Sequence, residues 1–96
     1  MKIILLGEAM GLFMAEETGP LSQVERFRAA IAGAEYNVAV GLARLGHEPA
    51  YCTRLGGDPI GLRIREGMAA NSIDQSLCLE APGELTGFML KGSTLE

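Results

Sequence analysis

The segment from residue 32 to residue 46 constrains the fold of this chain more than any other part of its sequence. It begins with small residues, continues as a helical pattern and stops at Gly46. Val38, Leu42 and Leu45 fall at positions i, i+4 and i+7, which places them on one face of a helix. Gly46 suits the left-handed conformation that often follows a helix end. The spacing therefore predicts a helix over residues 35–45 with one apolar stripe, and by itself it fits a plain amphipathic helix after a loop.

Strands are predicted on both sides of this helix. The unbroken apolar run Lys2–Leu6 is typical of a strand buried on both faces of a parallel sheet. A second strand is expected over Ala50–Leu55 and a last one over Thr86–Leu90, with an extended segment from Ser72 to Leu79 and a turn over 80–84. The region 10–30 is less regular, with short strands expected at 11–15 and 27–31 around a turn.

A second helix is predicted to begin at Asp58, which can cap free N–H groups, with Pro59 in the first position. Its buried stripe consists of Ile60, Ile64 and Met68. The charged side chains Arg63, Arg65 and Glu66 are expected to face water, and Asn71 to adopt the left-handed end position. Alternating strands and helices indicate an α/β fold with right-handed crossovers.

Composition excludes several classes of protein. The chain has 96 residues, 48% of them hydrophobic and 21% charged, as expected for one small globular unit. Its net charge of -4 without a basic run argues against nucleic acid or an anionic membrane as a partner. The apolar run Ile3–Leu6 is too short for a membrane span or a signal peptide. Cys52 and Cys78 stand alone, which favours a reducing cytoplasm and buried thiols over metal ligands.

Several segments, in order, resemble the N-terminal part of the ribokinase-like (PfkB) carbohydrate kinases. The sequence of residues 33–46 is similar to that of the 2-keto-3-deoxygluconate kinase branch. It consists of Gly-Ala-Glu-Tyr-Asn followed by Val-Ala-Val-Gly-Leu-Ala-Arg-Leu-Gly. Leu6-Gly7-Glu8 ends the first strand as in that branch, residues 54–61 resemble the second glycine-aspartate element of the family, and Thr86-Gly87 opens the last strand. The resemblance runs from about residue 3 to about residue 90.

The resemblance implies a three-layer α/β/α fold with a parallel sheet and part of a small β-sheet lid. Residues 1–96 would form an N-terminal fragment of a single kinase domain, because family members are about three times as long. Segments of approximately 10–31 and 85–96 would build the lid, which covers the sugar and often makes a homodimer contact. The alternative is that these segments are surface loops.

Four residues are candidates for the sugar site. The resemblance implies that Gly33 lets its backbone approach the sugar and that Asn37 hydrogen-bonds a sugar hydroxyl or carbonyl, since an amide both donates and accepts. Met89 occupies a position where the branch usually has an aromatic residue packed on the substrate. Glu8 follows a parallel strand, where ligands of open sheets gather, and either contacts the sugar or orders the first loop. The structural alternatives are a turn glycine for Gly33 and a cap to its own helix for Asn37.

Asp58 is interpreted as a helix cap, although Gly56-Gly57-Asp58 superficially resembles the Gly-Ala-Gly-Asp element that carries the catalytic base of the family. The resemblance implies that the base, the anion hole and the sites for ATP and Mg²⁺ belong to the full-length parent, so no cofactor is expected for this chain alone. The predicted function is the substrate-binding part of an ATP-dependent sugar or sugar-acid kinase. The alternative is a non-catalytic sugar-binding or dimerisation module. A Rossmann-type dinucleotide site at residues 7–11 is disfavoured because its glycine spacing is wrong.

Overall fold

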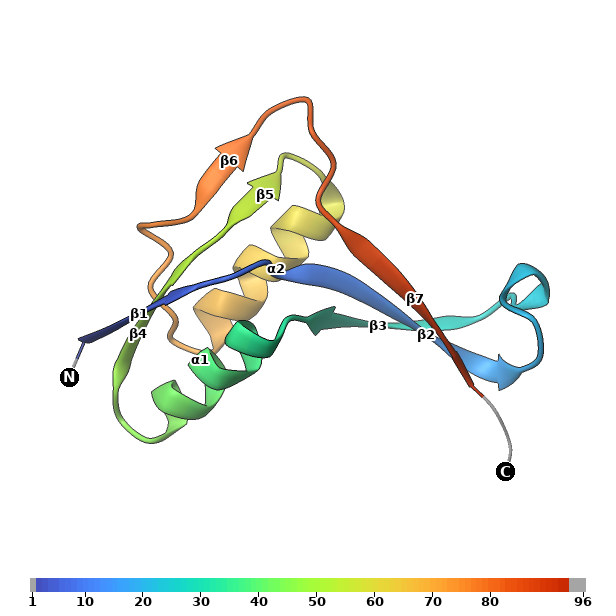
Figure 1. Cartoon of the computed structure of the whole chain (residues 1–96), viewed down its shortest axis with the longest axis horizontal. Helices are drawn as coiled ribbons and strands as arrows, with labels where there is room; N and C mark the ends of the chain where they lie inside the picture. Colours follow the sequence, from blue (N-terminus) through green and yellow to red (C-terminus); the bar gives the residue numbers. More distant parts are fainter. Residues whose placement is uncertain (1, 94–96) are drawn as a thin grey trace.

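The structure, a computed structural model, describes residues 2–93 as two packed parts, an α/β body and a separate small sheet (Figure 1). The elements, in chain order, are β1 (Lys2–Leu6), β2 (Met10–Thr18), the short 3-10 helix η1 (Leu21–Gln23), β3 (Phe27–Ala32), α1 (Ala34–Arg44), β4 (Glu48–Cys52), β5 (Arg54–Gly56), α2 (Pro59–Ala70), β6 (Leu79–Ala81) and β7 (Phe88–Ser93).

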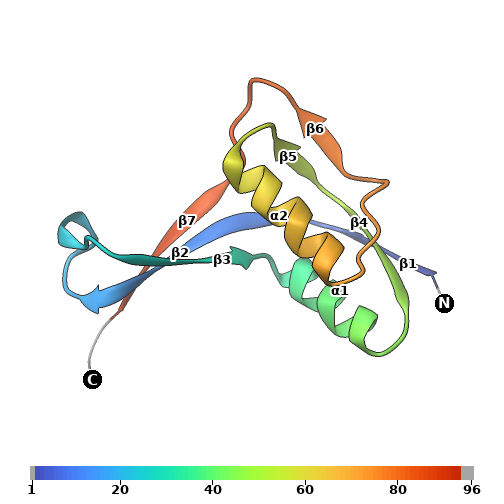
Figure 2. The ribbon, with the colours of Figure 1, turned by 180° about the vertical axis from the view of Figure 1, so that it is seen from behind.

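The body consists of parallel strands covered by two helices. β1 pairs with β4 in parallel from Lys2–Glu48 to Leu6–Cys52, and β5 pairs with β6 in parallel. Both helices lie on the same side of these strands, behind them in Figure 1 and in front of them in Figure 2. The predicted α/β class with parallel strands is confirmed, and within residues 2–93 the two helices form one layer on one face of the strands.

The core lies between the strands and the helices. Tyr51, Leu55, Ile64 and Met68 are its largest fully buried side chains besides a proline. Ile64 and Met68 of α2 are therefore buried as predicted. Arg65 does not face water as expected: it is partly buried, and its Nη2 atom is buried without a hydrogen-bond partner. The cause is the loop after α2, which folds back along the helix and donates from Gln75 Nε2 to the carbonyl of Arg65 at 3.0 Å.

Helix α1 turns a different face to the core from the predicted one. Val38 is 51% exposed and Leu45 77% exposed, whereas Tyr36 and Ala39 are the buried residues of the helix. The small side chain of Ala39 lets the helix approach the strands closely, and the Tyr36 ring lies 6.4 Å from the Tyr51 ring between centroids. The predicted apolar stripe is therefore wrong at Val38 and Leu45, whereas Leu42 is half-buried. The helix docks through the face that carries Ala39 because its small side chain allows the closest approach.

The helix ends largely follow the local signals. Gly46 follows α1 with φ of 89°, and Asp58 caps α2 ahead of Pro59, both as predicted. Asn71 is not left-handed: its φ is −103°, and the residue with positive φ is Ser72, at 58°. Asn71 instead donates through Nδ2 to the carbonyl of Gly67 at 2.8 Å, which holds the end of the helix by a side-chain bond.

The strands differ from the prediction mainly in their limits. The expected strand 50–55 is divided into β4 and β5 at Thr53, and the expected strand 11–15 extends from residue 10 to residue 18. The segment 72–79 is mostly loop, with a single bridge between Ala50 and Asp74, and becomes a strand only at Leu79.

β2, β3 and β7 form a three-stranded sheet of their own, called here the small sheet. β2 lies in the middle, antiparallel to β3 and parallel to β7. All three strands come from the segments predicted to build a lid, of which residues 94–96 lie outside the described residues. The small sheet projects from the body, away from the end of the molecule where the chain begins (Figure 1). Within residues 2–93, no helix has the length and apolar character that crossing a membrane requires.

Candidate functional site

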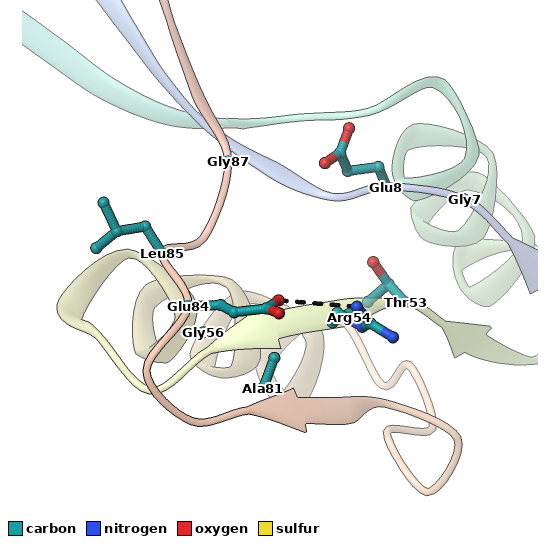
Figure 3. A pocket seen from close by; sticks show the side chains of 9 residues that line it. All are labelled: Gly7, Glu8, Thr53, Arg54, Gly56, Ala81, Glu84, Leu85 and Gly87. Atoms are coloured by element: carbon teal, nitrogen blue, oxygen red, sulfur yellow. Dashed lines mark ion pairs between the residues drawn. The ribbon is translucent and has the colours of Figure 1, made fainter.

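A hollow of about 280 Å³ lies where the parallel strands end and the chain passes to the small sheet. Its lining comes from the turn after β1, from β5 and the residues before it, and from the ends of the β6–β7 connection. The lining residues are Gly7, Glu8, Thr53, Arg54, Gly56, Ala81, Glu84, Leu85 and Gly87 (Figure 3). Ligands of open α/β sheets bind at the carboxyl ends of the strands, so the hollow occupies the expected place for a site.

The carboxylate of Glu8 is the acidic group nearest the small sheet in this hollow. Glu8 follows β1 and points toward the segment at Gly87 (Figure 3). A Cβ atom at Gly87 would lie 3.3 Å from Glu8 Oε2, so the absence of a side chain there leaves room for the carboxylate. Gly33 lies directly behind the backbone of Glu8. Only glycine fits there, because its φ is 137° and because a Cβ atom would lie 2.8 Å from the Glu8 carbonyl oxygen. Glu8 and Gly33 are thus brought together.

The turn that carries Glu8 is held by several contacts. The Gly7 N–H donates to the Cys52 carbonyl at 3.3 Å, and the Ala9 N–H donates to Thr53 Oγ1 at the same distance. The Glu35 side chain lies across Gly7, since a Cβ at Gly7 would be 2.7 Å from Glu35 Cδ. Glu35 is in the first turn of α1, where its charge also interacts favourably with the helix dipole. These contacts fix the backbone that presents Glu8.

Met89 lies on the face of the small sheet that is turned toward Glu8. Met89 is opposite Leu12 in the register of β7 and β2, and side chains alternate between faces along a strand. Gly87, two residues before Met89, faces Glu8 and Met10. The other face packs against α2, because a Cβ at Gly11 would meet the side chain of Ile60 at 2.8 Å. Met89 itself is exposed and is not among the residues that line the hollow.

Asn37 lies outside the hollow at Glu8. Its exposed side chain lines a groove between β3, α1 and α2, together with Arg44, Arg63 and Asn71. In residues 2–93 the structure thus separates Asn37 from the hollow at Glu8, although Asn37 and Gly33 are joined by a helical bond from the Asn37 N–H to the Gly33 carbonyl at 3.1 Å. A contact between Asn37 and a sugar stays a prediction.

Charge at the mouth of the hollow comes from one ion pair and from Glu8. Arg54 and Glu84 approach to 3.7 Å, and both side chains are largely exposed, so water screens this pair and its strength is small. Arg54 is the one cationic side chain in the lining. Beneath the strands, burial raises the pKa of Tyr51 to about 12, and the negative charge of Glu35 acts in the same direction. The Tyr51 hydroxyl is therefore neutral at physiological pH.

Asp58 has a second role that the sequence did not reveal. Besides accepting from the Gly61 N–H at 2.7 Å, as a cap does, it accepts from the N–H and the hydroxyl of Thr86 at 2.7 and 2.8 Å. These hydrogen bonds, those of Thr86 first, hold the pKa of the Asp58 carboxyl below its ordinary value. The Thr-Gly pair at the start of the last strand was the available signal for Thr86. Nothing in the sequence linked it to Asp58, 28 residues away.

The part of the chain that the structure describes contains no group of three or more His, Cys, Asp and Glu side chains arranged to hold a metal ion. What the hollow offers is hydrogen bonding to a small polar molecule by a carboxylate, a guanidinium and exposed backbone. Such a hollow, at the ends of parallel strands beside a small projecting sheet, lies where α/β proteins bind small polar ligands.

Comparison with known proteins places the chain in one family. The model for the pfkB family of carbohydrate kinases matches residues 1–93, and the chain belongs to this family. It is 37% identical over 94 residues to the 2-dehydro-3-deoxygluconokinase of Bacillus subtilis. That alignment covers 97% of the chain and 29% of the Bacillus protein.

Solved structures agree on the fold. The crystal structure of a PfkB protein from Polaromonas sp. JS666 matches with a TM-score of 0.92 and 44% identity, over 97% of this chain and 32% of that one. A sugar kinase from Pyrococcus horikoshii, solved in complex with ATP, matches with a TM-score of 0.86 and 28% identity. That match covers 94% of this chain and 30% of the Pyrococcus chain. The predicted ribokinase-like fold is confirmed. The chain spans less than a third of each of these relatives.

Proposed function

We propose that this chain is the sugar-binding portion of an ATP-dependent carbohydrate kinase and that the hollow at Glu8 receives the sugar. The observation that carries the proposal is the convergence of Glu8, Arg54 and Gly87 in one hollow at the carboxyl ends of parallel strands, with Gly33 behind the backbone of Glu8. A carboxylate accepts hydrogen bonds from sugar hydroxyl groups, and a guanidinium donates them to sugar oxygens. The small sheet would act as the lid over the bound sugar.

The chemistry of transfer needs groups beyond those in the hollow. A kinase must hold a hydroxyl in line with a terminal phosphate, remove its proton and neutralise the developing charge. The printed sequence contains no Gly-Ala-Gly-Asp element, which the family resemblance identifies with the catalytic base. We therefore assign binding and orientation of the sugar to residues 2–93. ATP and Mg²⁺, by family analogy, would act in the longer kinase, in the cytoplasm.

We favour a sugar acid similar to 2-keto-3-deoxygluconate as the substrate, because the Bacillus subtilis relative carries that activity in its name. The carboxylate of such a substrate would face Arg54, the one guanidinium in the lining, in competition with Glu84. Glu84→Gln removes that competition. It is expected to strengthen binding of 2-keto-3-deoxygluconate about two- to fivefold, the scale of an exposed ion pair, and to leave fructose and ribose unchanged.

The test is a calorimetric titration of the protein with 2-keto-3-deoxygluconate, fructose and ribose. The proposal predicts binding of at least one sugar, weakened roughly tenfold or more by Glu8→Gln, since a charged acceptor contributes on that scale. Glu48→Gln, at the opposite end of the neighbouring strand β4, is the matched control and should bind as the wild type does. Equal affinity of the wild type and Glu8→Gln would remove the hollow as the sugar site.

A non-catalytic sugar-binding or dimerisation module remains the second candidate, because the exposed apolar residues of β7 offer a surface for a second copy. Reading the gene downstream of Glu96 separates the two. A frame that encodes Gly-Ala-Gly-Asp ahead of a helix supports the kinase, and a stop codon without such a frame supports the module. In the kinase, Asn37→Ala is expected to raise the Michaelis constant, and unchanged kinetics would remove Asn37 from the site.

A further inference from the structure

The chain passes between the body and the small sheet three times, at residues 7–9, at Gly33 and at residues 86–87. At two of these three passages, the hydroxyl of a buried threonine forms hydrogen bonds that hold the chain in place. Thr53 accepts from the Ala9 N–H at the first, and Thr86 bonds to Gly56 and Asp58 at the third. Thr53 and Thr86 are also the buried polar residues of the part that the structure describes. Because buried polar groups need hydrogen-bond partners, these threonines indicate where the body and the small sheet must keep a fixed relative position.

The Thr86 hydroxyl has a fixed direction. The Gly56 N–H can only donate, and it lies 2.9 Å from Thr86 Oγ1. The Asp58 carboxylate can only accept, and its Oδ1 lies 2.8 Å from the same oxygen. The hydroxyl must therefore accept from Gly56 and donate to Asp58. Serine could replace threonine in this arrangement, whereas valine, with the same shape, could not.

Asp58 joins this hydroxyl to helix α2. Its carboxylate bonds the Gly61 N–H in the first turn and both the N–H and the hydroxyl of Thr86. Bonds to a charged acceptor are stronger than neutral ones. The backbone at Gly56 is also pressed against this cluster, since a Cβ there would lie 2.8 Å from both Asp58 Oδ2 and the Thr86 nitrogen. The start of β7 is thus attached to the end of β5 and the start of α2.

The attached segment is one wall of the hollow. Glu84, Leu85 and Gly87 line it, and β7 continues from Gly87 as an outer strand of the small sheet, paired with β2 only. Glu84 and Leu85 are exposed, so packing contributes little to holding this wall. On the side of the small sheet, the Gly87 carbonyl accepts from the Gly11 N–H at 3.0 Å. On the side of the body, Gly87 is held through the bonds of its neighbour Thr86 to Asp58 and Gly56.

We propose that Asp58 and Thr86 are positioning residues of the sugar site. The two residues do not line the hollow. They anchor the wall at Gly87 and the first residues of β7 to helix α2. In this way they set the width of the gap between the small sheet and Glu8, in which the sugar lies. The proposal rests on the sugar-binding function proposed above. The proposal gives Asp58, which the sequence marked only as a helix cap, control over sugar affinity although Asp58 does not line the hollow.

The test compares Thr86→Val, which keeps the shape and loses the hydroxyl, with Thr86→Ser, which keeps the hydroxyl. Thr18→Val, at the exposed end of β2, is the matched control. Two quantities are measured for each protein: affinity for 2-keto-3-deoxygluconate by calorimetry, and amide hydrogen exchange along β7, β1 and β4 without sugar. Thr86→Val is expected to bind roughly tenfold more weakly and to exchange faster in β7, with β1 and β4 unchanged. Thr86→Ser and Thr18→Val are expected to match the wild type in both.

Wild-type affinity in Thr86→Val would overturn the proposal, and so would equal acceleration of exchange in β7, β1 and β4, which marks a general loss of stability. If Thr86→Val does not fold, Asp58→Asn takes its place, because its amide keeps the size and puts a donor where an acceptor is needed. If the wild type binds none of the sugars, the proposed function fails. The exchange rates in β7 then decide alone whether the anchor exists.

Discussion

Single residues at the turn after β1 decide how the candidate site is presented. Gly7 leaves the space that the Glu35 side chain fills, and Gly33 leaves the space that the Glu8 carbonyl fills. The sequence identified Gly33 and Glu8 as candidates. Glu35 was not identified, because contact between Gly7 and Glu35 depends on how α1 docks against β1.

Gly7→Ala is expected to lower the free energy of unfolding by about 0.5–1.5 kcal/mol, because the added methyl group forces the flexible end of the Glu35 side chain out of its preferred rotamer. Gly41→Ala is the matched control, since a Cβ at Gly41 meets nothing within 4 Å. In the helix interior it should stabilise by about 0.5–1 kcal/mol. Urea denaturation of the two variants measures both effects, and Glu35→Ala should rescue Gly7→Ala. Equal stability of Gly7→Ala and the wild type would contradict the contact.

Tyr51→Phe removes a buried hydroxyl for which the described residues provide no partner. The expected result is unchanged or higher stability, because an unpaired buried polar group is unfavourable. Thr53→Val is the comparison: its buried hydroxyl accepts from the Ala9 N–H at 3.3 Å, so the variant should lose about 1–3 kcal/mol by leaving that N–H without a partner. Thermal or urea unfolding distinguishes them. A loss in Tyr51→Phe as large as that in Thr53→Val would show that the Tyr51 hydroxyl has a partner.

At the scale of elements, most local signals predicted the helix ends correctly, with Asn71 the exception, whereas contacts between residues distant in sequence were not predicted. The cap at Asp58, the proline after it and the left-handed Gly46 depend on neighbouring residues, and the structure has all three. The buried face of α1 was predicted wrongly because periodicity favoured the larger side chains, whereas the docking of α1 depends on Ala39. The bond between Asp58 and Thr86 was missed for the same reason, since 28 residues separate its partners.

Acid is expected to loosen the start of α2 through Asp58. Its pKa lies below the ordinary 3.8 in the folded chain, so its stabilising contribution is fully present above that value and is lost as the pH falls through the lowered pKa. Urea unfolding over a series of acidic pH values measures this loss, and Asp58→Asn should flatten the dependence. Asp74, whose pKa is lowered by bonds from Ser76, contributes with the same sign, so Asp74→Asn calibrates the comparison. A profile unaltered by Asp58→Asn would contradict the role given to this carboxylate.

At the scale of the whole molecule, the residues described leave large apolar side chains in water. Ile4 and Leu6 of β1 are 61% and 70% exposed, and Phe88 and Leu90 of β7 are also exposed. Large exposed apolar patches mark surfaces that another layer or another chain covers.

The chain on its own is therefore expected to self-associate in light scattering. Replacing Ile4 and Leu6 by threonine should reduce the association, whereas Leu62→Thr on the outer side of α2 should not. A monodisperse monomer of the unsubstituted chain would contradict this expectation.

The central claim is that a sugar binds in the hollow at Glu8 and Gly87, below the open face of the small sheet. The most direct measurement is the change in amide NMR resonances when 2-keto-3-deoxygluconate is added to the protein. Our account predicts that the largest shifts fall on Glu8, Gly33, Thr53 and Gly87. Shifts confined to the groove at Asn37, Arg44 and Arg63, with those four resonances unmoved, would contradict it.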